Sequence, residues 1–204
     1  MSIAQEKLTK NEIYSMICYG EENRNKIITN FDSSVVVLVD SLKVLKTDTI
    51  GIFSWTSHGS FLKSNVSKCE LSLWTAYIHW IKNGVTYYQK ISENCVFGPK
   101  VIKSSKLIDF YINNKIAINE NRIMPVITDV SMNEKGKYII TSVLTSSTAA
   151  YKIYCEFGGN STIKTFENYE IDNEENIFYN ENNNSVIKTW WELIEGQIAE
   201  IEKE

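Results

Sequence analysis

The chain has 204 residues, of which 43% are hydrophobic and 12% aromatic, and this supply of apolar side chains is sufficient for a folded core. Its formal net charge of −4 and its pI of about 5.4 argue against nucleic-acid binding. Only two prolines occur and no Pro/Gly/Ser-rich linker divides the chain, so we expect one globular domain over residues 1–204.

The first quarter of the chain predicts a helix and two strands. Residues 3–19 have an amphipathic helical pattern, with Leu8, Ile13 and Ile17 on one face. The β-branched and aliphatic run at 35–39 predicts a strand that is buried on both faces. Residues 40–48 fit either a loop or an irregular strand. Residues 49–56 predict a second strand, which a polar turn at 57–60 follows.

The strongest local signal is a β-hairpin centred on Asn83-Gly84. This dipeptide is the preferred centre of a type I′ turn, because both positions need a positive φ. A two-residue loop fixes the register, with Lys82 opposite Val85 and Trp80 opposite Tyr87. The face expected in the core carries Trp74, Ala76, Ile78, Trp80, Tyr87 and Ile91. The face expected to point outward carries Thr75, Tyr77, His79, Thr86, Tyr88 and Lys90.

The rest of the chain predicts two helices and four strands. Residues 99–119 have a helical apolar stripe, which also places Lys100, Lys103 and Lys106 on one solvated face. Strand-like runs follow at 122–130, 137–145, 150–157 and 161–169, and their short links favour an antiparallel meander. Residues 172–184 predict a loop, and 185–204 predict an amphipathic helix. The expected fold class is therefore α+β, a mainly antiparallel β-sheet (hairpin plus C-terminal-half meander) with N-terminal, central and C-terminal helices.

The charges are distributed unevenly along the chain. Residues 1–110 carry thirteen Lys/Arg and ten Asp/Glu, whereas residues 111–204 carry eight Lys/Arg and fifteen Asp/Glu. The acidic excess centres on residues 165–187, which contain no Lys or Arg. An acidic surface repels nucleic acid and anionic membranes, and it favours either a basic protein partner or simply solubility.

The cysteine spacing and the N-terminal residues indicate a compartment. Cys18, Cys69, Cys95 and Cys155 are too far apart in the sequence for a zinc motif. Residues 1–10 lack the apolar stretch of a signal peptide, and the run at 35–39 is far too short to span a bilayer. We therefore expect a cytoplasmic protein with free thiols and no membrane association. The Asn- and Ile-rich composition is associated with bacterial or phage proteins of low GC content.

No catalytic, metal or cofactor motif stands out. His58 and His79 are the only histidines, and either could act in acid–base chemistry, but no nucleophile elbow or triad pattern accompanies them. The more conservative interpretation places His58 in a polar turn and His79 in a cross-strand aromatic pair. The acidic run at 170–175 lacks the spacing and the central glycine of a calcium loop. We predict no catalytic residues, no metal and no cofactor.

Three groups of residues are candidates for contact with a partner. The first is the acidic segment, and the second is the outward hairpin face, which cross-strand packing also explains. The third is Trp191, because tryptophan is enriched at interface hot spots, although core packing also explains it. The candidate residues are Glu167, Glu170, Asp172, Glu174, Glu175, Tyr77, His79, Tyr88 and Trp191.

These features favour a non-enzymatic protein-binding domain with a basic protein partner. One such class is a cytoplasmic immunity protein, which inhibits a toxin nuclease through an acidic surface on a rigid frame. The first alternative is a small hydrolase-like enzyme that uses His58 or His79. The second is a structural or assembly subunit that self-associates through Trp191 or the hairpin face. The sequence leaves the oligomeric state open.

Overall fold

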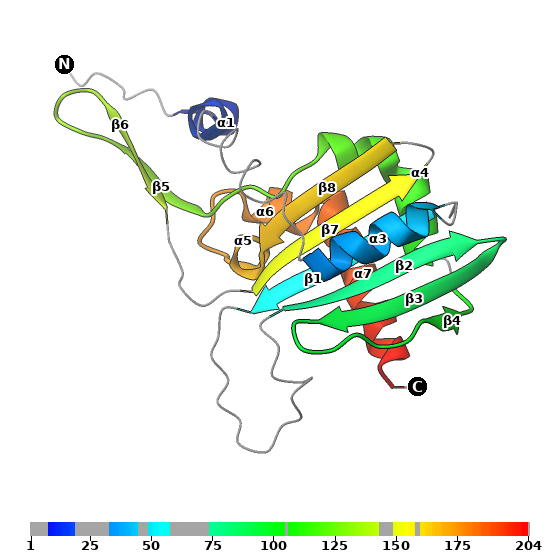
Figure 1. The fold of residues 1–204 in the computed structure, drawn as a ribbon. Coiled ribbons are helices and arrows are strands. Elements are labelled where there is room, and N and C mark those ends of the chain that lie inside the picture. Colours follow the sequence, from blue (N-terminus) through cyan, green and yellow to red (C-terminus); the bar gives the residue numbers. More distant parts are fainter. Residues whose placement is uncertain are drawn as a thin grey trace.

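The computed structural model describes residues 8–18, 33–44, 49–57, 74–104, 106–142, 149–157 and 160–203. Its main element is a six-stranded sheet in the order β4-β3-β2-β1-β7-β8, in which all neighbouring strands are antiparallel (Figure 1). The strands of this sheet are β1 (Thr49–Ser57), β2 (Trp74–Lys82), β3 (Val85–Ser92), β4 (Lys100–Ile102), β7 (Ala149–Phe157) and β8 (Asn160–Glu167). A second sheet pairs β5 (Ile127–Met132) with β6 (Tyr138–Ser142).

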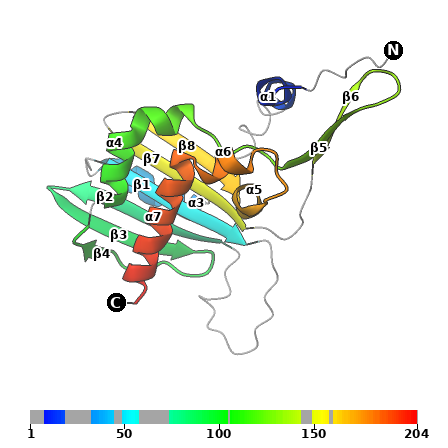
Figure 2. The ribbon, with the colours of Figure 1, turned by 180° about the vertical axis from the view of Figure 1, so that it is seen from behind.

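Helices cover both faces of the six-stranded sheet. On one face, α3 (Ser33–Val44) packs against β2 and β3 through Val39 and Leu42. On the other face, α4 (Lys106–Glu120) and α7 (Val186–Ile201) pack against β7 and β8, as the view from behind shows (Figure 2). The sheet is therefore the middle layer of three, and the middle of β2 is buried on both sides. The α+β class expected from the sequence is confirmed.

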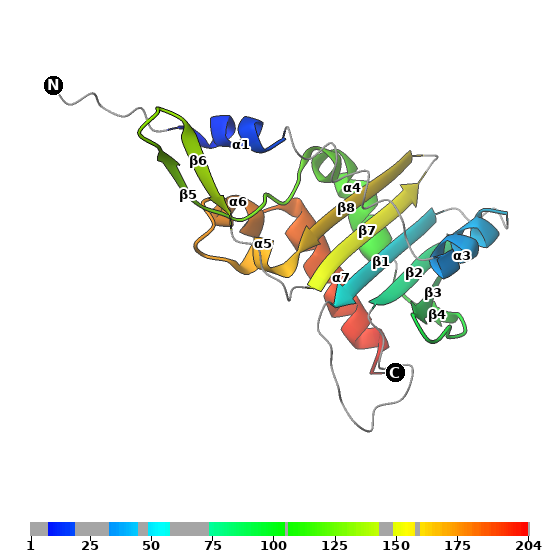
Figure 3. The same ribbon diagram turned by 60° about the vertical axis from the view of Figure 1, so that its left-hand side comes forward.

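A smaller apolar cluster lies beside this main body. It joins α1 (Lys10–Cys18) and the β5–β6 hairpin to Phe178, a buried residue between α5 (Asn168–Asp172) and α6 (Tyr179–Asn183) (Figure 3). Lys10 of α1 also forms an ion pair with Glu181 of α6. The expected N-terminal helix at 3–19 is thus confirmed over Lys10–Cys18. Leu8 and Thr9 precede the helix, and residues 3–7 and 19 lie outside the described part of the chain.

The predicted Asn83-Gly84 hairpin is confirmed in its register. Lys82 pairs with Val85, Trp80 pairs with Tyr87 and His79 pairs with Tyr88. Asn83 and Gly84 have φ values of 52° and 71°, which are the positive values that a type I′ turn requires. The predicted core face is also buried, and Trp80 stacks on Tyr87 at a ring-centroid distance of 5.5 Å.

The predicted strand at 35–39 is wrong, because this run lies inside α3. Val39 and Leu42, three positions apart, face the core, whereas Val37 is 65% exposed on the opposite side of the helix. A short apolar run has no periodicity that separates a buried strand from one face of a helix. The strand predicted at 49–56 is confirmed as β1, and residues 58–60 of the expected turn lie outside the described residues.

Three other elements differ from the expected boundaries. The central helix begins at Lys106, and the segment before it contains the short strand β4, in which Val101 pairs with Tyr87. The four C-terminal strands form two hairpins in different sheets, because β7 pairs with β1 and not with β6. The expected loop at 172–184 instead contains the end of α5 and all of α6.

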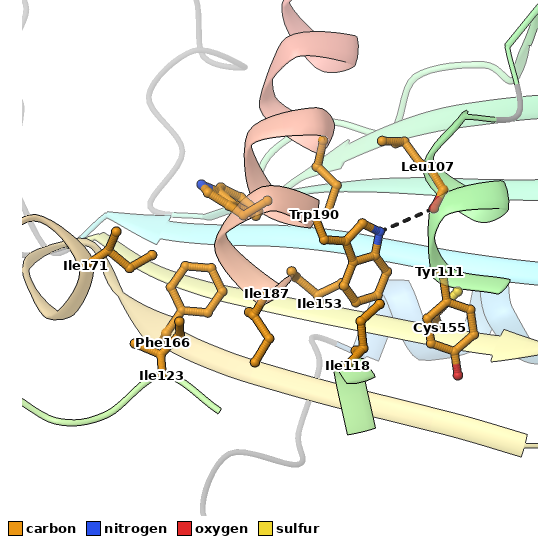
Figure 4. Packing of buried hydrophobic residues seen from close by; sticks show 12 residues of the cluster. Leu107, Tyr111, Ile118, Ile123, Ile153, Cys155, Phe166, Ile171, Ile187 and Trp190 are labelled. Atoms are coloured by element: carbon orange, nitrogen blue, oxygen red, sulfur yellow. Dashed lines mark hydrogen bonds between the residues drawn. The ribbon is translucent and has the colours of Figure 1, made fainter. Parts of the chain in front are cut away.

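The predicted C-terminal helix is confirmed as α7. Ser185 caps its N-terminus by accepting a hydrogen bond from the Lys188 backbone N–H at 3.1 Å. Trp190, which is fully buried, stacks on Tyr111 of α4 and donates a hydrogen bond from Nε1 to the Leu107 carbonyl oxygen at 3.2 Å (Figure 4). This contact fixes α7 against α4 above the sheet.

Candidate functional site

The hairpin face that was expected to point outward is buried, so this expectation is wrong. Tyr77, His79 and Tyr88 are at most 6% exposed. Ile198 and Ile201 at the end of α7, together with Ile102 of β4, cover Tyr77 and Tyr88. The physical reason is that this sheet has a helix on each face, so neither side of the hairpin remains free. The three side chains are not available on the surface for a partner.

His79 is also a poor candidate for acid–base chemistry. Its side chain is 1% exposed, and burial lowers its pKa to about 3. A general acid or base works best with a pKa near the working pH, so a histidine that stays neutral across the physiological range does not fit this role. His58, the other histidine, lies outside the described residues.

Trp191 is part of the core and does not lie on an exposed surface, contrary to the interface interpretation. Its ring packs against Tyr151 at a centroid distance of 4.1 Å and meets Phe166 edge-on at 5.7 Å. Aromatic pairs of this kind stabilise a core beyond the area that they bury. Core packing, the other interpretation of Trp191, therefore describes the structure.

The acidic segment divides into a structural part and a surface part. Glu170 is buried, and its Oε2 accepts a hydrogen bond from the Glu167 backbone N–H at 2.8 Å, which stabilises the start of α5. Asp172, Glu174 and Glu175 are exposed where α5 ends and in the turn that follows. The expectation that Glu170 projects into solvent is therefore wrong, while Asp172, Glu174 and Glu175 do lie on the surface.

Two carboxylates of α7 extend this surface, and the sequence analysis did not select them. Partial burial raises the pKa of Glu195, a hydrogen bond with the Trp191 side chain lowers it in part, and the negative charges of Asp172 and Glu192 raise it further. The interaction between Asp172 and Glu195 shows that the end of α5 and the exposed side of α7 lie in one region. We name Asp172, Glu174, Glu175, Glu192 and Glu195 the acidic surface. A signal existed in the sequence, since Glu192 and Glu195 are three residues apart and lie off the apolar stripe.

The charges of the acidic surface are only slightly compensated by nearby cations. Glu192 pairs with Lys188 at 3.0 Å, a contact between neighbouring turns of α7. Among the described residues, no Lys or Arg forms an ion pair with Asp172, Glu174 or Glu175. Like charges that lie in one region of the surface repel one another. The arrangement can therefore attract a cation or a basic protein.

A buried polar cluster lies between α4 and β8. The Tyr111 hydroxyl shares a hydrogen bond with Thr162 Oγ1 at 2.8 Å, and that oxygen donates to Asn119 Oδ1 at 2.5 Å. Cys155, opposite Thr162 in the sheet, is fully buried, and burial raises its pKa to about 12. The thiolate is the nucleophilic form, so this cysteine is inert and the cluster is a packing feature.

The two cysteines whose state the structure gives, Cys95 and Cys155, differ from each other. Cys95 is disulfide-bonded, so the expectation of free thiols is wrong for this residue, whereas Cys155 is free. Within the described ranges, no cluster of three or more His, Cys, Asp or Glu side chains is arranged to hold a metal ion. None of the described helices has the length and the apolar character needed to cross a membrane.

Comparisons with known proteins do not add a family. No family model, no curated protein and no solved structure matches this chain at a significant level. The acidic surface is therefore interpreted from its own geometry and charge.

Glu195→Gln is expected to stabilise the protein at pH 7. A raised pKa means that the ionised form is penalised in the folded state. This penalty is present at pH 7 and disappears at about pH 3 and below, where the carboxyl is protonated in both states. Thermal melts should show a rise of about 1–2 °C at pH 7, in the range for a surface substitution in a chain of this length.

The same melts at low pH should show no difference between Glu195→Gln and the wild type. Glu134→Gln, in the exposed turn between β5 and β6, provides a matched control that should leave the melting temperature unchanged at both pH values. A lower melting temperature for Glu195→Gln at pH 7 would show that the Glu195 charge is compensated in the folded protein.

Proposed function

We propose that this chain is a non-enzymatic protein-binding domain, and that its acidic surface binds a basic protein. The observation that carries this proposal is the exposure of Asp172, Glu174 and Glu175 without an ion pair to a described residue. Asp172 also acts on Glu195 of α7, whose pKa is raised first by partial burial and then by the charges of Asp172 and Glu192. Like charges that are held close together destabilise the folded protein, and a role in binding would explain why the sequence carries them. A basic partner would neutralise them and relieve that cost.

The frame that carries the acidic surface is rigid. Asp172 follows the hydrogen-bonded start of α5, and Glu192 and Glu195 lie on α7, whose apolar side is buried against α4 and the sheet. Preorganised charges lose little conformational entropy when they bind, and they steer association over several ångströms. Both properties suit an inhibitor that must capture its target rapidly.

The class of partner that fits best is a toxin nuclease, in the manner of an immunity protein. The substrate-binding surface of a nuclease is basic because it binds a polyanion. A rigid group of carboxylates can occupy such a surface without any catalytic group of its own. Among the described residues, the enzyme alternative loses its support with the burial of His79, and His58 lies outside them.

The cytoplasmic location expected from the sequence has one observation against it. Disulfides persist in oxidising compartments and are rare in the cytoplasm, and Cys95 is disulfide-bonded. An inhibitor that meets its target outside the cytoplasm would keep this bond. Thiol titration of protein isolated without reducing agent distinguishes the two locations, because a cytoplasmic pool should have a reactive Cys95.

Neutralising the acidic surface is expected to weaken partner binding without unfolding the domain. The test variant combines Asp172→Asn, Glu174→Gln and Glu175→Gln, three exposed positions without an ion pair to any described residue. The basic protein is sought by co-expressing this chain with the products of the neighbouring reading frames. The Kd of that partner should rise about tenfold or more in the variant, which corresponds to about 1.4 kcal/mol.

A control with the same change in net charge separates local contact from the total charge. Glu120→Gln, Asp129→Asn and Glu134→Gln are exposed positions on α4 and the β5–β6 hairpin, and together they remove the same three charges. This control variant should retain most of the affinity. Equal losses in the two variants, or co-purification of no basic protein, would contradict the proposal.

A further inference from the structure

Exposed apolar side chains gather at one edge of the six-stranded sheet. Among the described residues, eleven large hydrophobic side chains are exposed, and four of them lie on β3, on β4 or on the segment between these strands. These four are Val85, Val96, Phe97 and Val101, and we name them the edge patch. Val96 and Val101 are 65% and 63% exposed. Single exposed hydrophobic residues are ordinary, whereas a group along one edge marks an interaction surface.

Most of the edge patch lies on the face of the sheet that α3 covers. Residues that pair across an antiparallel ladder share a face, and Val101 pairs with Tyr87, which stacks on Trp80 in the α3 core. Val96 likewise pairs with Ile91. In the ribbon, α3 lies over β1 and β2, and β4 lies beyond it at the edge of the sheet (Figure 1). This part of the apolar face therefore continues past the helix into solvent.

Two lysines next to the edge patch, Lys82 and Lys103, have no ion pair with a described residue. Lys82 pairs with Val85 across the hairpin, so its side chain leaves the sheet on the same face as the patch. Lys90, by contrast, is already neutralised by Glu202 at 2.7 Å. Lys103, two positions after Val101, also has no ion pair with a described residue, whereas Lys100 pairs with Tyr88 and lies on the opposite face.

We propose that the edge patch binds an acidic, extended peptide segment of another protein. Apolar side chains of the segment would cover Val96 and Val101, and its carboxylates would meet Lys82 and Lys103. Charge complementarity selects this occupant, because a basic segment would be repelled by the same lysines. The surface is separate from the acidic surface on α5 and α7, so it goes beyond the function proposed above.

The segment docks through its side chains and does not add a strand to the sheet. β4 has only three residues, and Pro99, which has no backbone N–H to donate, comes directly before it. Short strands, proline and lysine are devices that protect a sheet edge from pairing with another strand. Edge protection alone does not explain the patch, because exposed valines promote association.

A synthetic peptide of alternating glutamate and valine tests this proposal. It is labelled with a fluorophore and titrated with the full chain, and fluorescence anisotropy reports binding. The glutamate–valine peptide should bind, a lysine–valine peptide should not, and added salt should weaken the binding. Failure of the glutamate–valine peptide to bind, or equal binding of the lysine–valine peptide, would overturn the proposal.

Paired variants locate the binding surface. Val101→Glu should weaken binding of the glutamate–valine peptide about tenfold or more, whereas Ile163→Glu, at an exposed apolar position on the opposite edge strand β8, should not. If Val101→Glu does not fold by circular dichroism, Val96→Glu replaces it. Equal affinities for the two edge variants would overturn the proposal. So would a concentration-dependent dimer in sedimentation that Val101→Glu abolishes, since the occupant would then be a second copy.

Discussion

A chain that ends at Asn184 is expected to remain unfolded at 25 °C. This truncation removes α7, which contributes Ile187, Trp190, Trp191, Ile194 and Ile201 to the buried apolar clusters. Fully burying a large apolar side chain is worth about 1.5–3 kcal/mol, so the loss of five approaches the whole stability of an average domain. Circular dichroism and size-exclusion chromatography of the truncated chain measure this directly.

Point variants in α7 test whether its buried side chains stabilise the fold while the helix itself is retained. Ile194→Ala removes a fully buried side chain and should cost about 2–5 kcal/mol in urea unfolding. Leu193→Ala, one position earlier and facing solvent, should change stability by about 0.5 kcal/mol or less. A truncated chain that melts within a few degrees of the full chain would show that α7 is an appendage.

Asn182→Ala is expected to cost about 3 kcal/mol or more. Asn182 is fully buried, and its side chain binds the backbone at three points. Oδ1 accepts from the Met124 N–H at 2.7 Å, while Nδ2 donates to the carbonyl oxygens of Met124 at 2.8 Å and Glu170 at 2.7 Å. Each buried backbone group that loses its partner costs about 1–3 kcal/mol.

The matched control for this prediction is Asn180→Ala, because Asn180 is exposed on the same short helix. It should leave the free energy of unfolding nearly unchanged. Urea denaturation followed by tryptophan fluorescence compares both variants with the wild type. A loss below about 1 kcal/mol for Asn182→Ala would mean that the segment around α6 is held by other contacts, such as Phe178.

The elements that the sequence predicted well depend on local chemistry. The Asn83-Gly84 turn sets its own dihedral angles, so the hairpin and its register follow from two residues. The stripe that includes Trp190 and Ile194 has a clear helical period, and the structure buries it as expected. Pairing of β1 with β7, by contrast, joins strands that are nearly a hundred residues apart, and no local signal determines it.

The burial of the hairpin face that carries Tyr77, His79 and Tyr88 shows that the sequence pattern of this face was ambiguous between a buried and an exposed surface. A face with Tyr77, Tyr88 and Lys90 looks polar, yet the tyrosine rings are apolar and only their tips need water or a partner. The Tyr77 hydroxyl donates to Glu202 Oε1 at 3.1 Å, and the Lys90 ammonium donates to the same carboxylate. The end of α7 therefore covers the rings while its Glu202 satisfies the polar tips.

The Asn-rich segment at 172–184 was expected to be a loop, because its composition was also ambiguous. Asparagine favours turns in general, but a buried asparagine amide can replace missing backbone partners. Asn176 Oδ1 accepts from the Ile127 and Phe178 N–H groups, so this residue also ties the segment to β5. Such contacts depend on a partner strand about fifty residues away, and the sequence carries no periodic signal for them. Asp172, Glu174 and Glu175, which make no such contact, are the members of the segment that the sequence placed correctly on the surface.

The most direct test of the proposed function is the association rate with the basic partner as a function of ionic strength. Electrostatic steering makes the rate fall as salt screens the charges, with a Debye length of about 8 Å at physiological ionic strength. Stopped-flow measurements compare the wild type, the Asp172/Glu174/Glu175 variant and the Glu120/Asp129/Glu134 control variant. We expect the first variant to associate more slowly and with a flatter salt dependence, while the control variant follows the wild type. Identical salt dependence for the wild type and the Asp172/Glu174/Glu175 variant would contradict a binding role for the acidic surface.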